Sequence, residues 1–510
     1  MPKGGNGALQ RGALAVATLL SASLTASLAS GYEAEVTARS DAQFYTLQSP
    51  YGDPLLRRRR YTQTLGLTVY DITGSYEPGA PQLSARALLR MDADFGQDAR
   101  ERSPSTPDRY IPGLEQAPLD LMYAYVEGRG YLGGLLGFRA GRQYVVDALG
   151  WWSFDGGLAK LSTPAYFNVD IYGGFEQRGG LPWLSTSRFE AQGVYRGDRS
   201  GLAAGDWPSF LDQSTPAPAY GFALESSGVH FLSTRLSYRK VINRDEVRLT
   251  PFDDGSGAIQ VMKGDRVSSE RLGYAARVSH ESLGSLHGEA VYDLYNQLVS
   301  ELSGGIDAYV TERLTLGASY DYYLPTFDGD SIWNWFSHNG QTTLSGRAVL
   351  ELSRRFDVAL SGGARLYTTD GDPVTYGAYQ RSSQLADRES IKTLVDHFGD
   401  VSGGYRWPSG SVHLGALAET GQRGHRYGAD LTTRQRFDQG RYDTLLVLSL
   451  HDWEDGLRPQ RSATSVGYVA GLGHELIEET RVGLEWEHHT SRLVGQRYRV
   501  LATLDLTLLD

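Results

Sequence analysis

The chain has 510 residues, no cysteine and a formal net charge of −11, with 61 Gly and 31 Tyr against 4 Met. The lack of cysteine excludes disulfides as a source of stability, and the acidic balance argues against nucleic acid as a partner. After residue 30 no apolar stretch is long enough for a transmembrane helix.

Residues 1–30 have the composition of a secretory signal peptide. Lys3 and Arg11 give a basic start, residues 12–28 are apolar or small, and Ser27-Leu28-Ala29 fits a cleavage site. No linker separates domains after this segment. We therefore expect a signal peptide at 1–30 and a single unit at 31–510.

Most of the remaining chain alternates apolar and polar residues with a period of two, which is the pattern of β-strands. In the final strand, for example, Tyr498, Val500 and Ala502 share one parity, whereas Arg497 and Arg499 hold the other. The clear strands are 32–44, 61–69, 83–95, 165–175, 188–196, 272–278, 286–294, 302–308, 314–322, 344–352, 356–366, 401–407, 412–418, 427–433, 442–450, 464–472, 480–486 and 498–508.

The lengths of the links between these strands point to a membrane barrel. From Leu286 onward short links, such as 312–313 and 353–354, tend to alternate with long ones, such as 324–341 and 367–396. Outer-membrane barrels have short periplasmic turns and longer outer loops, and closure removes the exposed edges of a wide sheet. We therefore predict an all-β fold, a large closed antiparallel transmembrane β-barrel of roughly 18–24 strands.

Aromatic residues near the strand ends support a membrane setting, because aromatic girdles mark the two lipid interfaces of such barrels. They are Tyr61, Phe95, Tyr322, Tyr323, Trp407, Tyr442, Trp453, Trp486 and Tyr498. In a soluble β-sandwich the same aromatics would be ordinary strand residues, but that alternative does not explain why they lie near strand ends.

The polar faces of the strands then become the lumen. A barrel this wide leaves an aqueous interior unless it is plugged, and we expect its lining to include Arg86, Arg90, Asp92, Asp94, Arg188, Arg235, Arg239, Arg347, Arg365, Arg406, Arg434, Arg481 and Arg497. These charges either pair across strands as a structural ladder or offer arginines to an anionic or hydroxyl-rich solute. An inward-folded loop or the N-terminal segment is expected to narrow the lumen. Arg57, Arg58, Arg59 and Arg60 are a candidate constriction, the alternative being a lipid-binding outer loop.

One segment resembles the alginate-export family of outer-membrane barrels and related porins. It contains Gly141-Arg142-Gln143, then Phe154-Asp155-Gly156, then a strand at 165–174. The resemblance implies that a strand ends in the first tripeptide, that a constricting loop follows, and that the second tripeptide opens the next strand. It also implies passive passage of polysaccharides or small polar solutes.

Residues that could support an enzyme do not form a recognisable constellation. His451-Asp452 with Asp253-Asp254 resembles the residues of omptin-type outer-membrane proteases, but nothing in the sequence brings the two pairs together. Adjacent histidines, His488 and His489, would point to opposite faces of a strand. The sequence therefore predicts no catalytic residue, no metal site and no cofactor.

Together these features predict a porin-like channel in the outer membrane of a Gram-negative bacterium, passing a hydrophilic or anionic solute, with export of a polysaccharide as one candidate. A structural or surface-adhesion barrel is the alternative, and a barrel enzyme is the least favoured. The expected partners are outer-membrane lipid and lipopolysaccharide, the solute, and the barrel assembly machinery, but not nucleic acid.

Overall fold

The computed structural model describes residues 33–73, 79–94, 119–177, 217–226, 228–250, 260–326, 340–370, 391–455, 458–492 and 495–509. Among these residues, no helix is long and apolar enough to cross a membrane. The predicted signal peptide at 1–30, and the predicted strand at 188–196 with Arg188, lie outside the described residues.

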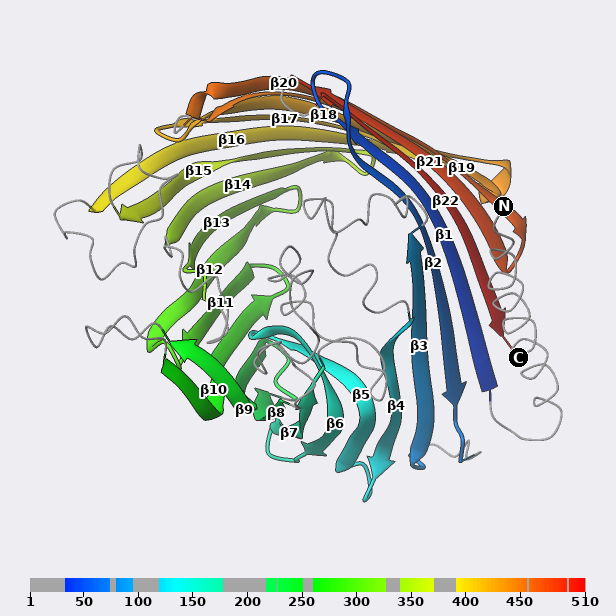
Figure 1. The fold of residues 1–510 in the computed structure, drawn as a ribbon, viewed down its shortest axis with the longest axis vertical. Helices are drawn as coiled ribbons and strands as arrows, with labels where there is room; N and C mark the ends of the chain where they lie inside the picture. The colour runs from blue at the N-terminus through cyan, green and yellow to red at the C-terminus, as the bar shows by residue number, and fades with distance from the viewer. Residues whose placement is uncertain are drawn as a thin grey trace.

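The described residues form one 22-stranded antiparallel sheet in which each strand pairs with the next and β22 pairs with β1 (Figure 1). The sheet is therefore a closed ring, as predicted. Its strands are β1 Glu33–Gln48, β2 Pro54–Tyr70, β3 Gln82–Asp94, β4 Leu119–Tyr131, β5 Leu136–Asp147, β6 Gly150–Ser162, β7 Phe167–Glu176, β8 Pro218–Ser226, β9 Leu232–Thr250, β10 Gln260–His280, β11 Gly284–Asp293, β12 Leu298–Thr311, β13 Leu314–Tyr323, β14 Gln341–Ser353, β15 Phe356–Asp370, β16 Ile391–Trp407, β17 Gly410–Gly421, β18 Gly424–Phe437, β19 Tyr442–Asp455, β20 Arg458–Ile477, β21 Thr480–Ser491 and β22 Gly495–Leu509.

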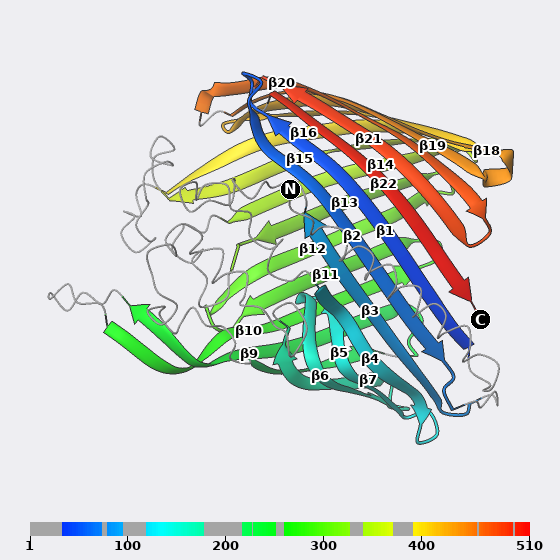
Figure 2. The same cartoon turned by 45° about the vertical axis from the view of Figure 1, so that its right-hand side comes forward.

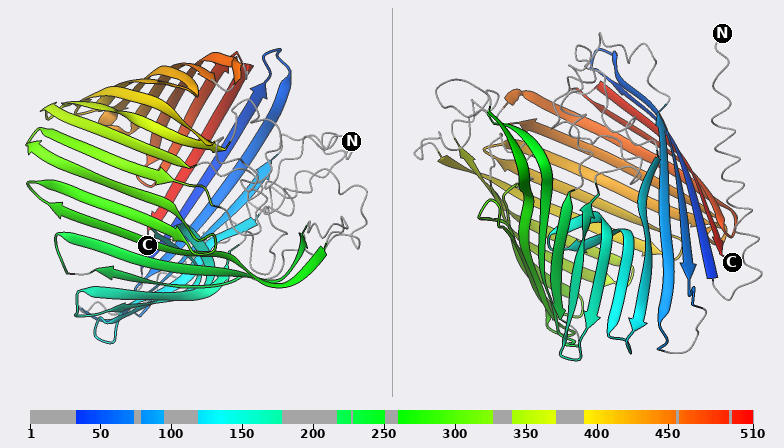
Figure 3. Two further views of the ribbon diagram at one scale, coloured as in Figure 1. Left: turned by 90° about the vertical axis from the view of Figure 1, so that its left-hand side faces the viewer. Right: turned by 60° about the horizontal axis from the view of Figure 1, so that its bottom comes forward.

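The two ends of the barrel differ in their connections. One end, here the turn end, carries the start of β1, the end of β22 and tight links such as 312–313, 354–355 and 408–409. The other end, the loop end, carries the long links 95–118, 324–340 and 371–390. The strands run obliquely between the two ends, and β9 and β10 extend past the rest of the wall (Figures 2 and 3). The predicted sorting of link lengths is thus present in part: the longest links lie at the loop end, but that end also carries short links at 49–53, 148–149, 294–297, 422–423, 456–457 and 492–494.

The register of the paired strands gives the sheet two faces of different chemistry. One, the apolar face, exposes a belt of large side chains from strand to strand: Leu286, Ile306, Leu316, Leu344, Leu360, Val401, Leu414, Leu448, Leu472, Leu484 and Leu504. The opposite face, the charged face, carries most of the ion pairs between neighbouring strands. Strict alternation in the sequence produces this division, because successive side chains of a strand point to opposite faces.

The aromatic residues predicted to form girdles divide between the faces. Trp407 stacks on Tyr405 on the apolar face, and on the same face Trp486 contacts Tyr468. Tyr323 pairs with Glu301 and Trp453 with Arg426, so both belong to the charged face and that part of the prediction is wrong. Phe95 lies outside the described residues.

Candidate functional site: the barrel interior and an inward-folded hairpin

The hairpin formed by β5 and β6 leaves the barrel wall and bends into the ring (Figures 1 and 3). Its tight turn, at residues 148–149, reaches strands that are not its neighbours in the sheet. The Arg239 side chain on β9 donates a hydrogen bond of 2.8 Å to the carbonyl oxygen of Leu149. On β10, a Cβ added to Gly273 would lie only 2.8 Å from the Leu149 side chain, so the hairpin tip rests directly on this strand.

Glycines at the base of the hairpin permit the bend. Gly141 has φ +126°, and a Cβ there would lie 2.3 Å from the carbonyl oxygen of Ala124 on β4. On the other arm, a Cβ at Gly156 would lie 2.1 Å from the carbonyl oxygen of Gly173 on β7. Any larger residue would meet backbone at both positions, which explains why glycine is required where these strands turn inward.

A small apolar core holds the inner side of the hairpin against the wall. Val145, Trp152 and Phe154 are buried, together with wall residues that include Tyr172 and Val241. The Trp152 and Phe154 rings stack with centroids 4.5 Å apart, and the Arg239 guanidinium lies 5.2 Å from the centre of the Trp152 ring. Burying a large apolar side chain stabilises by about 1.5–3 kcal/mol, so this cluster contributes substantially to docking of the hairpin.

The tripeptides that suggested a family resemblance lie within this hairpin. The Arg142 guanidinium is buried and donates two hydrogen bonds to the Asp155 carboxylate, at 2.7 and 2.8 Å, and one to the Leu121 carbonyl oxygen. The Gln143 side chain is fully buried and donates to the Gly156 carbonyl oxygen at 2.9 Å. Neither tripeptide ends or opens a strand, contrary to the prediction, because both lie inside paired strands with Gln143 opposite Phe154.

The position of the hairpin identifies the charged face as the interior. Its tip lies inside the ring and contacts Arg239 and Gly273, which share the charged face of β9 and β10. The register carries this assignment from strand to strand around the closed sheet. The predicted residues Arg86, Arg90, Asp92, Arg235, Arg239, Arg347, Arg365, Arg406, Arg434, Arg481 and Arg497 accordingly belong to the interior face. Asp94 pairs in register with Arg60 on that face, and its side chain lies outside what the structure describes.

Many interior arginines pair with carboxylates on the same or nearby strands. Arg347 lies 2.6 Å from Asp307, and Arg406 lies 2.7 Å from Asp357. Other pairs join Arg90 to Asp92 and Asp120, Arg235 to Asp170 and Glu225, Arg365 to Glu419, Arg481 to Asp443, and Arg497 to Glu487. Much of the interior charge thus forms a ladder between strands, one of the two interpretations left open by the sequence.

The four consecutive arginines at the start of β2 do not act as one cluster. Arg58 and Arg60 belong to the interior face, whereas Arg57 and Arg59 alternate to the apolar face. Arg60 lies 2.8 Å from Asp92. Among the described residues it is the β5–β6 hairpin that crosses the ring. Its tip lies between the two tripeptides, where the family resemblance implied a constricting loop, whereas Arg57 to Arg60 were the candidate drawn from the residues themselves.

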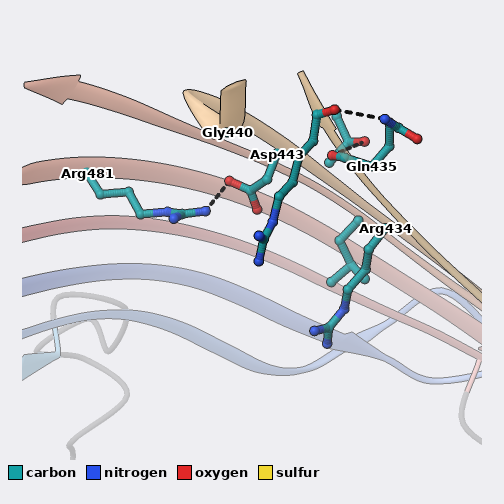
Figure 4. A pocket seen from close by; sticks show the side chains of 8 residues that line it. Arg434, Gln435, Gly440, Asp443 and Arg481 are labelled. Carbon is teal, nitrogen blue, oxygen red and sulfur yellow. Dashed lines mark hydrogen bonds and ion pairs between the residues drawn. The ribbon is translucent and has the colours of Figure 1, made fainter. Parts of the chain in front are cut away.

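One part of the interior carries an excess of arginine. Near the turn between β18 and β19, Arg434, Arg436 and Arg481 line a hollow of about 560 Å³ with Asp443 (Figure 4). Asp443 pairs with Arg481. Within the described part of the chain, no carboxylate lies within ion-pair distance of the Arg434 or Arg436 guanidinium. Three guanidiniums against one carboxylate make this hollow electropositive, so it can attract an anion.

The residues considered for catalysis are separated by the fold. His451 lies 3.2 Å from Asp430 on the interior face, and its neighbour Asp452 points to the other face, where it lies 3.5 Å from His425. His488 and His489 likewise point to opposite faces, and Asp253 and Asp254 lie outside the described residues. Among the described residues no cluster of three or more histidine, aspartate or glutamate side chains could hold a metal ion.

Comparison with known proteins gives no family. No family model and no curated protein matches the chain. Solved structures with a similar fold include OccAB1 of Acinetobacter baumannii, with 10% identity, 94% of this chain and 96% of that chain covered, and a TM-score of 0.41. OpdL of Pseudomonas aeruginosa has 10% identity, covers 94% and 99%, and has a TM-score of 0.40. A likeness at this level of identity and TM-score carries no argument about function.

Proposed function

We propose that this protein is an outer-membrane channel for small hydrophilic solutes. The observation that carries the proposal is a sheet closed on itself, with a continuous apolar belt outside and charged residues inside. In hydrocarbon every backbone polar group needs an internal partner, and a closed barrel supplies one for each strand. An exposed apolar belt of this extent has no stabilising role in water, whereas lipid would cover it.

The two ends of the barrel support an orientation. The turn end, which carries both chain termini of the barrel, would face the periplasm of a Gram-negative bacterium, and the loop end would face outward. The β5–β6 hairpin enters the ring from the loop end, since its turn at 148–149 belongs to that side. In this orientation a solute from outside meets the hairpin before it reaches the hollow lined by Arg434. Contact with outer-membrane lipid and lipopolysaccharide, and insertion by the barrel assembly machinery, follow from the same proposal.

We further propose a preference for anions, although a modest one. Most interior arginines are neutralised by a carboxylate, so the whole lumen is not strongly basic. Arg434 and Arg436 support the preference, because they add positive charge on the solute path and the carboxylate nearest in register, Asp443 opposite Arg436, pairs with Arg481 instead. Arg86 contributes in the same way, since its guanidinium lies 5.9 Å from the Tyr70 ring centre rather than against a carboxylate.

Two finer functions concern the solute and the outer links. Export of a polysaccharide and membership of the alginate-export type have no support from a family model. A surface-adhesion role would depend on long outer links such as 371–390, which lie outside the described residues. The charged, solvent-accessible interior favours conduction over a purely structural role.

Conductance in planar lipid bilayers tests the proposal. The purified barrel should produce stepwise currents in KCl, and its reversal potential in a salt gradient should show a weak anion preference. Heat-modifiable migration in gels should accompany this activity, because a folded barrel resists detergent until boiled. A barrel that shifts on boiling yet conducts at no voltage would contradict the channel and leave the fold intact.

A further inference from the structure

The surface of the hairpin that does not pack on the wall is apolar and exposed. Tyr144, Val146 and Trp151 project from it, and the exposed fractions of Val146 and Trp151 are 64% and 63%. In the regular wall these positions would point outward. Because the hairpin bends into the ring and buries its opposite side, this surface turns toward the interior instead.

Ring contacts with β4 establish that orientation independently. The Tyr144 ring lies 6.1 Å from the ring of Tyr123, centroid to centroid. Tyr123 pairs in register with Leu88, two residues from Arg86 and Arg90, so it belongs to the interior face. Tyr144 holds a position on β5 that would point outward in the regular wall, yet its ring contacts that of Tyr123, which points inward from β4. This contact is possible only where the hairpin has folded inward.

The aromatic rings continue as a row from the wall onto the hairpin. Tyr125 and Tyr123 have ring centroids 5.8 Å apart, Tyr123 and Tyr144 follow, and Tyr144 and Trp151 are 6.3 Å apart. At the wall end the Arg139 guanidinium lies 4.7 Å from the Tyr125 ring centre. The row thus begins beside the positively charged guanidinium of Arg139 and ends on Trp151, the most exposed aromatic side chain of the hairpin.

Packing does not account for the exposed end of this row. The buried core of the hairpin uses Trp152, its neighbour on the opposite side, whereas Trp151 remains mostly accessible from the interior. Large apolar side chains exposed in a polar interior have an unfavourable hydration free energy unless something covers them. A flat ring with an apolar face matches both the geometry of the row and the preference of aromatic side chains for stacked partners.

We infer that Tyr123, Tyr144 and Trp151 form a stacking surface on which a ring-bearing solute is retained as it passes the hairpin. The inference rests on the proposed channel. The shared chemistry of its ligands is a flat apolar ring face, either an arene or the face of a sugar ring, on a molecule small enough to enter the lumen. Trp151, at the exposed end, makes the first and largest contact.

Interruption of single-channel current by three sodium salts tests this inference. Benzoate presents an arene, glucuronate presents a sugar ring, and acetate is a carboxylate without a ring. The wild-type barrel should show longer interruptions with a ring-bearing anion than with acetate. Trp151→Ala should shorten them by about two- to tenfold, which is the range expected for one stacked pair. Trp151→Phe should restore most of the residence time, whereas Val146→Ala, on the same surface, should change it little.

The outcomes separate the stacking surface from the channel itself. A loss confined to benzoate supports an arene as the ligand, and a loss confined to glucuronate supports a sugar ring. Equal interruptions by all three salts, or no effect of Trp151→Ala, would overturn the inference. Conductance in KCl would in that case still support the proposed channel. If the barrel conducts no ions, the proposed function fails. Saturation transfer from detergent-solubilised barrel to benzoate or glucuronate ring protons, with Trp151→Ala as control, then decides the stacking surface alone.

Discussion

Removal of the Trp152 side chain should release the hairpin tip without opening the barrel. Trp152 is 7% exposed, stacks on Phe154 and lies beneath the Arg239 guanidinium. Truncation of a buried tryptophan to alanine costs about 3–5 kcal/mol. The wall does not depend on this contact, because its strands are joined by backbone hydrogen bonds around the ring. The loss therefore falls on docking of the hairpin.

A change of about 3–5 kcal/mol shifts the balance between docked and released hairpin by roughly two to three and a half orders of magnitude. Planar-bilayer recordings of Trp152→Ala should show a raised mean conductance, with fluctuations between levels that the wild type lacks. Trp151→Ala is the matched control, since it removes the same side chain type from the exposed side of the same hairpin. If Trp152→Ala and Trp151→Ala gave identical steady conductance in KCl, the hairpin would not narrow the lumen.

Three further predictions concern the wall, the charges and the bend. Leu360→Arg, on the exposed apolar belt, should lower the free energy of unfolding of the barrel in lipid vesicles by about 2–4 kcal/mol. Ser361→Arg is the control, because the next residue faces inward, and it should lower that free energy far less. Unfolding in urea measures both variants. The double replacement Arg434→Ala with Arg436→Ala should move the reversal potential toward cation preference, and an unchanged potential would show that these arginines do not influence passing ions. Gly156→Ala should sharply reduce the yield of heat-modifiable barrel, because its new methyl group would meet the Gly173 carbonyl oxygen.

The barrel and its two faces could be predicted because alternation of side chains along a strand is a local property. In β15, for example, the positions 356, 358, 360, 364 and 366 are apolar, whereas 357, 361 and 365 are Asp, Ser and Arg, so the face that meets lipid is visible in the sequence. The first and last strands, β1 and β22, show the same alternation, and their pairing closes the ring.

The strands between 119 and 162 were missed for a physical reason. Where the hairpin bends inward, one of its faces packs in an apolar core and the other carries the exposed aromatic row. Odd- and even-numbered positions of its strands are therefore both apolar. Val145 and Val146, and Trp151 and Trp152, are adjacent pairs that each place one residue on either side. Alternation disappears at the very segment that narrows the lumen. Two signals were available: the family resemblance, which implied a constricting loop between the tripeptides, and the glycines Gly141 and Gly156, because glycine within a strand marks close approach of backbones.

Pairing of the interior charges could be anticipated only in outline. Opposite charges on neighbouring strands were expected to form a ladder, but their partners depend on register. Arg365, for example, reaches across β16 to Glu419 on β17, although Asp396 is its register partner on β16. The electropositive hollow depends in the same way on how β18, β19 and β21 align, which alternation within any one strand does not specify.

The most direct test of the account uses the absence of cysteine from the chain. Val401→Cys and Ser402→Cys place single thiols on adjacent positions of β16, the first on the exposed apolar belt and the second facing the interior. A charged, membrane-impermeant thiol reagent added to a conducting barrel in a planar bilayer should lower the current stepwise in Ser402→Cys and leave Val401→Cys unchanged. Modification of Val401→Cys with no response from Ser402→Cys would contradict a lipid-facing belt around a conducting, charged interior.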